Sequence, residues 1–278
     1  MKYPAIYYSD YLELSKILSS QSPKSKTHGK EAHDETLFII IHQTYELWFK
    51  QILHELNSIH KIMSSPRIRP SLLSTITHRL ERITGIQKIL NDQLKIIETM
   101  TPLDFMDFRD YLVPASGFQS TQFRSIETVL GLKSQYRLEA DRQFFTMRLS
   151  LEDQKQINEL EKQTSILELL NQWLERMPFT DDTNFNFWTE YKSCVEKMLD
   201  EEAEIIEKTN TGSSKQKELE LANLKGTKET FGILFDDKKY QKLFDSGKFR
   251  LSRKAKLAAI FTQLYRDEPI LQLPHKVL

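Results

Sequence analysis

The stretch from His33 to Ser58 carries a long helical pattern that constrains the fold more than any other feature. Its apolar side chains recur at alternating steps of four and three, at Leu37, Ile41, Tyr45, Trp48, Ile52 and Leu56, and continue to Ile59. That spacing places them on one face of an α-helix, and it is sustained for too long to be a strand. Asp34 and Glu35 fall in the expected first turn, where carboxylates suit the exposed N–H groups and the positive end of the helix dipole. We therefore expect a long helix with one buried face.

One histidine stands beside this apolar stripe. His42 lies one turn after Phe38 and one turn before Glu46, so the rings of Phe38 and His42 are expected to stack along the same edge of the helix. A histidine on the buried flank needs a partner, which can be structural or chemical. The residues alone favour a core histidine with a satisfied hydrogen bond over a catalytic one.

The composition favours a cytoplasmic protein. The 278 residues suffice for one large domain or two small ones. Lysine plus arginine equals aspartate plus glutamate at 39 each, so no overall charge attracts nucleic acid or an anionic membrane. Cys194 is the only cysteine, which excludes an internal disulfide and fits a reducing compartment. No apolar run in the sequence resembles a signal peptide or a membrane span.

The remaining sequence also indicates helices. Glycine is scarce, at 8 residues, and no convincing period-two alternation is present. Helical spacing recurs from Leu72 to Met100, from Thr101 to Leu112, from Leu160 to Leu174, from Phe187 to Leu199 and from Ser252 to Leu264. A further helix is expected to end at Gly131. We expect an all-α bundle of long antiparallel helices forming one domain over residues 1–278. Ser71 is expected to cap the second helix. Residues 19–30 are expected to form a loop, and residues 200–226 are expected to form a charged surface excursion.

One short helix has strong start signals. Thr101 is the expected N-cap, Pro102 the first helical residue, and Asp104 lies in the first turn. The helix places Phe105 and Arg109 one turn apart on one face. An arginine beside aromatic rings is either paired with a structural acid or kept for an anionic ligand.

Generic motifs for chemistry are missing. The sequence contains no P-loop, dinucleotide-binding glycine pattern, H-E-x-x-H or nucleophile elbow. None of the seven histidines pairs with another at a spacing typical of a metal site. The tyrosine-rich N-terminus favours a docked terminal helix over a functional arm. The residues by themselves predict only a helical domain.

A family resemblance adds a function. The stretches HDETLFIIIHQTYELWFKQILHEL, ETMTPLDFMDFRDYLVPASGFQSTQFRSIE and RLSRKAKLAAIFTQLYRDEP together resemble the tryptophan 2,3-dioxygenases. The resemblance runs from about Tyr8 to the C-terminus and is weakest in the acidic middle region. It implies an all-helical homotetramer that uses haem b and O2 to cleave the indole C2–C3 bond of L-tryptophan, giving N-formylkynurenine. It also implies that N-terminal residues complete the active site of a neighbouring subunit.

The family's F-I-x-x-H pattern matches the segment FIIIH, which comprises Phe38, Ile39, Ile40, Ile41 and His42. The resemblance implies that this segment binds the substrate. Phe38 would pack on the indole ring. His42 would lie on the oxygen-binding side of the haem, near the indole N–H, as a hydrogen-bonding and packing group rather than an obligatory base.

Five further residues match family positions. Arg109 matches the arginine of the F-R-[DE]-Y motif and would hold the substrate carboxylate through two parallel hydrogen bonds. Phe105 matches an aromatic position of the same pocket, and Ser116 a serine near the haem edge and the substrate ammonium group. Tyr8 and Tyr11 match tyrosines that reach across the subunit interface, which favours the functional arm.

The resemblance places no metal ligand within the chain. The family's haem-ligating histidine lies after the part that matches YRDEPILQLPHKVL, and so beyond Leu278. We therefore expect the domain to be C-terminally incomplete and leave haem binding by this chain alone in question.

Three interpretations of the chain stay open at this point. Intact pocket motifs favour part of a tryptophan dioxygenase. A degenerate, non-catalytic paralogue that binds indole amino acids or regulates a partner is an alternative. A related haem protein with altered chemistry is a third, against which Phe38, His42 and Arg109 argue.

Overall fold

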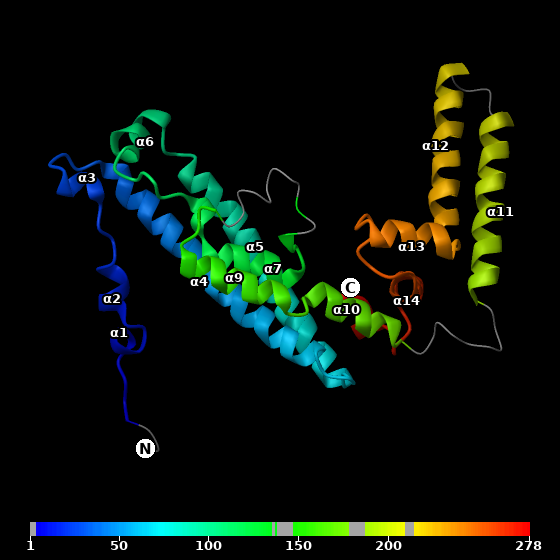
Figure 1. Ribbon diagram of the computed structural model, residues 1–278, viewed down its shortest axis with the longest axis horizontal. Helices are drawn as coiled ribbons and strands as arrows, with labels where there is room; N and C mark the ends of the chain where they lie inside the picture. Colours follow the sequence, from blue (N-terminus) through cyan, green and yellow to red (C-terminus); the bar gives the residue numbers. More distant parts are fainter. Residues whose placement is uncertain (1–3, 135–136, 138–146, 178–186, 209–213) are drawn as a thin grey trace. The chain divides into compact units, whose positions relative to one another are not determined.

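The computed structural model describes residues 4–134, 137, 147–177, 187–208 and 214–278. All regular secondary structure in these residues is helical, so the all-α prediction is confirmed for the described part of the chain (Figure 1). The chain divides into two compact units, one of residues 1–62 and 75–165 and one of residues 63–74 and 166–278. One domain over residues 1–278 stays a prediction. Within the described residues, no helix has the length and apolarity to cross a membrane.

Two long antiparallel helices form the centre of the first unit. Helix α4 spans His33–Met63 and α5 spans Pro70–Ile97. The Tyr45 hydroxyl donates to the Leu90 carbonyl at 2.6 Å, and Arg82 donates to Glu55 at 2.5 Å. Later positions on α4 therefore meet earlier positions on α5, as the antiparallel prediction requires (Figure 1). Pro70 begins α5, so the expectation that Ser71 caps this helix is wrong.

The predicted stripe on α4 is buried most deeply in the C-terminal half of the helix. Ile52, Leu56 and Ile59 are almost completely buried, and Ile41 is buried as well. The Glu55 carboxylate lies beside this stripe and accepts from Arg82. Burial raises the pKa of Glu55. Hydrogen bonds from Arg82 and Gln51 and the positive charge of Arg82 lower this pKa by more, so the net pKa lies below the usual value.

The N-terminal segment contains three short helices, α1 (Tyr8–Tyr11), α2 (Leu14–Leu18) and α3 (Lys24–Thr27). The prediction of a loop over residues 19–30 is wrong at α3, because a residue from another helix caps it. The Glu35 carboxylate of α4 accepts from the backbone N–H groups of Lys24 at 2.7 Å and Ser25 at 2.9 Å. A distant acceptor of this kind is invisible to local sequence patterns.

Helix α6, Pro102–Arg109, begins as predicted. The Thr101 hydroxyl and the Asp104 carboxylate form a reciprocal capping box. Helix α6 packs against α3, and the rings of His28 and Tyr111 stack beside this contact with centroids 4.6 Å apart. Glu35 therefore supports α6 through α3.

A 3-10 turn, η1 (Gly117–Gln119), leads into α7 (Thr121–Leu130), which packs against α9 (Leu151–Lys162). Gly131 ends α7 as predicted, with the positive φ of 115° that glycine tolerates. The prediction of a single helix from Leu160 to Leu174 is wrong. Helix α9 ends where Gln163 turns to extended backbone, and His60 Nε2 lies 2.7 Å from the Thr164 carbonyl in the break.

The second unit contains α10 (Ile166–Glu175), α11 (Phe187–Lys208), α12 (Ser214–Ile233), α13 (Asp237–Asp245), α14 (Arg253–Leu264) and α15 (Gln272–Val277). Helices α10 and α14 pack through buried Leu174, Ala255 and Ala258. Helix α14 closely matches the helix predicted from Ser252 to Leu264, with Ser252 as its N-cap. Helices α11 and α12 pack side by side (Figure 1). Of the stretch expected as a charged excursion, residues 200–208 belong to α11 and residues 214–226 to α12, while residues 209–213 lie outside the described residues.

We predict that Glu35→Gln lowers the free energy of unfolding at pH 7 by about 1–3 kcal/mol, because buried N–H groups lose a charged acceptor. Burial raises the pKa of Glu35, but hydrogen bonds from Ser25 and Lys24 lower it more, so the net pKa lies below its usual 4.5. The stabilisation is therefore complete above pH 4.5 and is lost as the pH falls through the lower folded-state pKa.

Urea denaturation at pH 7 and below pH 4 measures this difference. Glu159→Gln is the matched control, because Glu159 forms an exposed ion pair with Lys162, and the effect of this substitution should stay within about 0.5 kcal/mol. A Glu35→Gln variant as stable as the control at pH 7 would show that the carboxylate does not hold α3.

Candidate functional site

Three phenylalanines from α4 and α6 form a compact group, called here the aromatic cluster: Phe38, Phe105 and Phe108. The Phe38 ring centroid lies 5.8 Å from that of Phe105 and 5.5 Å from that of Phe108. Phe105 and Phe108 meet edge to face at 5.3 Å. Phe108 is fully buried, whereas Phe38 and Phe105 keep partial exposure. The cluster thus has a fixed base and two rings that a ligand can reach.

His42 extends this cluster along α4. Its ring centroid lies 4.1 Å from that of Phe38, as the sequence predicts, and its Nδ1 lies 2.7 Å from the Phe38 carbonyl oxygen. A carbonyl only accepts, so Nδ1 carries the proton in this contact and Nε2 is left for another partner. The interpretation of His42 as a core histidine is wrong, because its side chain is exposed.

His42 also lines a cavity of about 310 Å³. The other lining residues come from α4, α5 and the segment around η1, and they are mostly apolar or aromatic: Ile41, Tyr45, Glu46, Phe49, Leu94, Ile97, Gly117, Ser120 and Phe123. His42 therefore connects the aromatic cluster with this cavity. Of the three isoleucines in the FIIIH segment, only Ile41 is among the lining residues, while Ile40 is exposed.

Arg109 lies one turn after Phe105 on α6 and is exposed. Its Nη1 lies 3.9 Å from the Met106 sulfur, and no carboxylate pairs with it among the described residues. Of the two alternatives for this arginine, the structural acid is therefore not observed in this part of the chain. Its guanidinium remains available to an anion beside the aromatic cluster.

Ser116 positions the segment that follows α6. Its hydroxyl accepts from the Phe118 N–H at 3.3 Å, and its own N–H donates to Gln119 at 3.0 Å. The next residue, Gly117, lines the cavity with His42. Ser116 is thus one residue from the cavity, with its hydroxyl hydrogen left for another acceptor.

Tyr8 and Tyr11 are not brought to the aromatic cluster within the chain. Both belong to α1, which packs against α2, and their exposed fractions are 74% and 72%. Figure 1 shows α1 and α2 apart from α6. Ile6 and Tyr7 beside them are also exposed, so the N-terminal arm presents an apolar surface.

Leu278, beyond which the family's iron-ligating histidine is expected, is not part of this site. It directly follows α15 in the second unit, its side chain is partly exposed, and its N–H donates to the His275 carbonyl at 3.2 Å. It belongs neither to the aromatic cluster nor to the residues that line the cavity beside His42. A metal ligand beyond Leu278 therefore stays a prediction.

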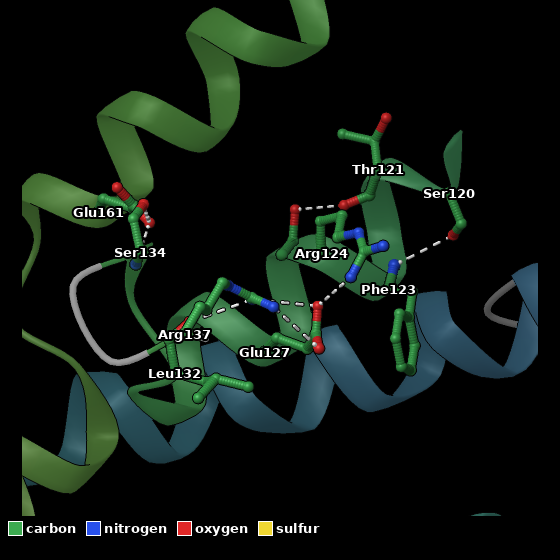
Figure 2. A network of polar contacts seen from close by, with 10 residues as sticks. Ser120, Thr121, Phe123, Arg124, Glu127, Leu132, Ser134, Arg137 and Glu161 are labelled. Carbon is green, nitrogen blue, oxygen red and sulfur yellow. Dashed lines mark hydrogen bonds and ion pairs between the residues drawn. The ribbon is translucent and has the colours of Figure 1, made fainter. Parts of the chain in front are cut away.

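Sequence reasoning missed a charged network behind the cavity wall (Figure 2). The Glu127 carboxylate accepts from Arg124 at 2.9 Å and from Arg137 at 3.1 Å. Arg137 also donates to the Leu132 carbonyl at 3.1 Å, which ties the segment after α7 to the helix. The three-residue spacing of Arg124 and Glu127 signals an ion pair on a helix, but no local pattern points to Arg137.

This network supports an aromatic part of the cavity wall. The Arg124 guanidinium carbon lies 6.0 Å from the Phe118 ring centroid and 5.9 Å from that of Phe123. Phe123 in turn lines the cavity and lies 5.4 Å from Phe49. Glu127 therefore fixes the guanidinium against which these rings pack.

Comparison with known proteins decides the family. Residues 2–278 match the family model described as tryptophan 2,3-dioxygenase. The chain belongs to the tryptophan 2,3-dioxygenase family. It is 45% identical to the tryptophan 2,3-dioxygenase of Alteromonas mediterranea, over 98% of this chain and 75% of the relative. It is 46% identical to that of Bdellovibrio bacteriovorus, over 100% and 77% respectively, and 41% identical to that of Xenopus tropicalis, over 98% and 67%.

Membership of the tryptophan 2,3-dioxygenase family confirms the recognised resemblance and the predicted enzyme class. It favours a dioxygenase over the alternative of a non-catalytic paralogue. The family is haem-dependent, and it implies tryptophan and O2 as substrates.

We predict that Glu127→Gln lowers the free energy of unfolding by about 3–5 kcal/mol, because two largely buried arginines lose their neutralising carboxylate. Urea denaturation measures the loss. The double variant Glu127→Gln/Arg137→Met should recover part of it, since one uncompensated charge is removed. Equal stability of Glu127→Gln and the unchanged chain would contradict a structural role for this network.

Proposed function

We propose that Phe38, His42, Phe105 and Arg109 bind L-tryptophan, and that the chain uses haem b to cleave the substrate's indole C2–C3 bond with O2. The observation that supports this most is the position of His42. Its ring lies 4.1 Å from Phe38 in the aromatic cluster, and the same side chain lines the neighbouring cavity. One imidazole can thus contact both an indole on the cluster and a group in the cavity.

The partly exposed rings suit an indole. Phe38 and Phe105 offer tilted aromatic surfaces 5.8 Å apart, above the buried base of Phe108. Aromatic rings prefer such offset or edge-to-face contacts, worth about 0.5–1.5 kcal/mol beyond their burial. The indole would therefore bind to Phe38 and Phe105, and its orientation would be limited by these two rings.

Arg109 would recognise the amino acid end of the substrate. Its guanidinium lies one turn from Phe105 and has no carboxylate partner among the described residues. A guanidinium holds a carboxylate through two parallel hydrogen bonds, which fixes both position and orientation. Ser116, whose hydroxyl oxygen accepts from Phe118, would contribute near the substrate ammonium group.

The tautomer of His42 fits the indole N–H. Because Nδ1 donates to the Phe38 carbonyl, the neutral ring presents Nε2 as an acceptor. An indole N–H donates only, so Nε2 is the matching group. In this arrangement His42 orients the substrate by hydrogen bonding and packing.

The residues of the cavity fit a haem that brings its own iron. Its walls include Ile41, Tyr45, Phe49 and Phe123, which suit the apolar faces of a porphyrin. Among the described residues, no group of three or more His, Cys, Asp or Glu side chains could hold a bare metal ion. When bound, haem would supply the dioxygen chemistry, while these side chains would hold the macrocycle and exclude water.

The N-terminal arm would act between subunits. Tyr8 and Tyr11 are strongly exposed and lie outside the site of their own chain. We propose a homotetramer in which these tyrosines complete the pocket of a neighbour. Burial of Ile6, Tyr7, Tyr8 and Tyr11 against a neighbouring subunit would remove an exposed apolar surface from water. The cytoplasmic location stays a prediction.

We predict that Arg109→Met raises the KM for L-tryptophan about tenfold or more, because the carboxylate loses a charged partner worth about 1.5–3 kcal/mol. Arg109→Lys should recover only part of the loss, since lysine keeps the charge without the bidentate geometry. Steady-state kinetics of N-formylkynurenine formation measures both.

Tryptamine, which lacks the carboxylate, distinguishes recognition from damage. The affinity for tryptamine, measured by its competition with L-tryptophan, should be the same in the unchanged enzyme and in the Arg109→Met variant. Arg266→Met is a control in the second unit and should leave the KM unchanged. A KM for L-tryptophan that Arg109→Met does not alter would remove this residue from the carboxylate role.

We predict that deletion of residues 1–18 lowers both activity and assembly, because the arm's tyrosines would be lost from a neighbour's pocket. The deletion keeps Ser20, whose carbonyl accepts from Gln43 at 3.1 Å. Mixed oligomers of arm-deleted and Arg109→Met subunits should regain activity, since an intact arm can then meet an intact pocket. A fully active arm-deleted enzyme would contradict this assignment.

A further inference from the structure

The second unit contains a groove of about 1130 Å³ outside the candidate site, called here the α12 groove. One face of α12 forms its long wall, through Asn223, Gly226, Thr227, Thr230 and Phe231, and Leu234 continues it just after the helix. From Asn223 to Phe231 the wall covers eight helical steps, or about 12 Å at a helical rise of 1.5 Å per residue. The wall carries no charge, and its middle consists of small side chains.

The base of the α12 groove belongs to a packed core. Leu234 and Tyr240 are buried together with Leu257, and Phe249 packs against them. The Tyr240 hydroxyl donates to the Leu251 carbonyl at 3.0 Å, which fixes the segment opposite α12. The groove is therefore held open by the same contacts that stabilise this part of the fold, as pre-formed ligand sites usually are.

The opposite rim of the α12 groove is cationic. Lys248, Arg250 and Lys256 line it, and no aspartate or glutamate is among the lining residues. Lys248 and Lys256 are exposed, and neither forms an ion pair with a carboxylate in the described part of the chain. The groove thus combines a neutral wall, apolar at Phe231 and Leu234, with one positively charged edge.

Gly226 is not explained by packing within α12. Glycine inside a helix costs about 0.5–1 kcal/mol relative to alanine. A side-chain carbon added at Gly226 would meet no atom within 4 Å, so no neighbouring segment approaches closely enough to require glycine there. What the glycine does provide is space in the middle of the groove wall.

We propose that the α12 groove binds a small amphipathic carboxylate, such as a medium-chain fatty acid. Its chain would lie along the neutral wall past Gly226 and Thr230, and its carboxylate would meet the cationic rim. Charge complementarity selects an anion, and the elongated groove, whose lining surface as a whole is mostly apolar, selects a chain over a compact polar ion. The site is independent of the proposed tryptophan pocket, because every lining residue belongs to the second unit.

Isothermal titration calorimetry of the full 278-residue chain tests the proposal with two matched probes. Decanoate and decylammonium have the same chain length and opposite charges. Both are used below their micelle-forming concentrations. Decanoate should bind to a single site, and decylammonium should bind at least about tenfold more weakly, because it meets the lysines with like charge. Equal binding of the two probes would overturn the proposal.

Two glycine variants on α12 locate the binding. Gly226→Leu should abolish decanoate binding by filling the groove, and the helix should be at least as stable, since leucine favours helix over glycine. Gly232→Leu is the matched control, because Gly232 is on the same helix, also has open space at its Cβ position, and does not line the groove. Circular dichroism confirms that both variants fold. Decanoate binding by Gly226→Leu equal to that of Gly232→Leu would overturn the site.

Charge reversal and sedimentation complete the test. Lys248→Glu/Lys256→Glu should weaken decanoate binding about tenfold, from two reversed surface interactions. Sedimentation of the unchanged chain and of Gly226→Leu shows whether the groove instead holds a second copy. Self-association that Gly226→Leu removes, without decanoate binding to the unchanged chain, would replace the carboxylate with a second protomer and refute the proposal.

Discussion

The buried carboxylate of Glu35 holds the substrate end of the first unit together. It accepts from the N–H groups that begin α3, and α3 packs against α6, which carries Phe105 and Arg109. Removing a buried charged acceptor leaves its donors without a partner, which costs more than the bond itself contributes. One side chain in the first turn of α4 thus supports α6 through α3, while the aromatic cluster packs α6 directly on Phe38.

Regular spacing and local capping made much of the helical fold predictable. The α4 stripe, the N-cap at Thr101, the stop at Gly131 and the helix that begins after Ser252 all depend on residues a few positions apart. The errors came from distant partners. A loop was predicted where Glu35 caps α3, and one helix was predicted across the break before Ile166. Such contacts depend on tertiary placement that a short window does not contain.

The candidate site was predictable to a similar extent. Helical spacing predicted that Phe38 and His42 meet along one edge of α4, and the structure confirms the contact, with ring centroids 4.1 Å apart and the two rings tilted by 36°. It misjudged the exposure of His42, because a position on the flank of a stripe is buried only if another element covers it. The second arginine of the Glu127 network lies beyond the end of α7, where no helical period connects it to the carboxylate.

His42 and the Phe38 carbonyl both belong to α4, so the imidazole tautomer is set by a contact within a single helix. In an α-helix the carbonyl of residue i already faces residue i+4, so the backbone itself supplies the acceptor for Nδ1. Many enzymes use a separate carboxylate for that task. Here helical geometry selects the tautomer of the ring. Nε2 stays the acceptor as long as α4 is helical and the His42 ring keeps its contact with the Phe38 carbonyl.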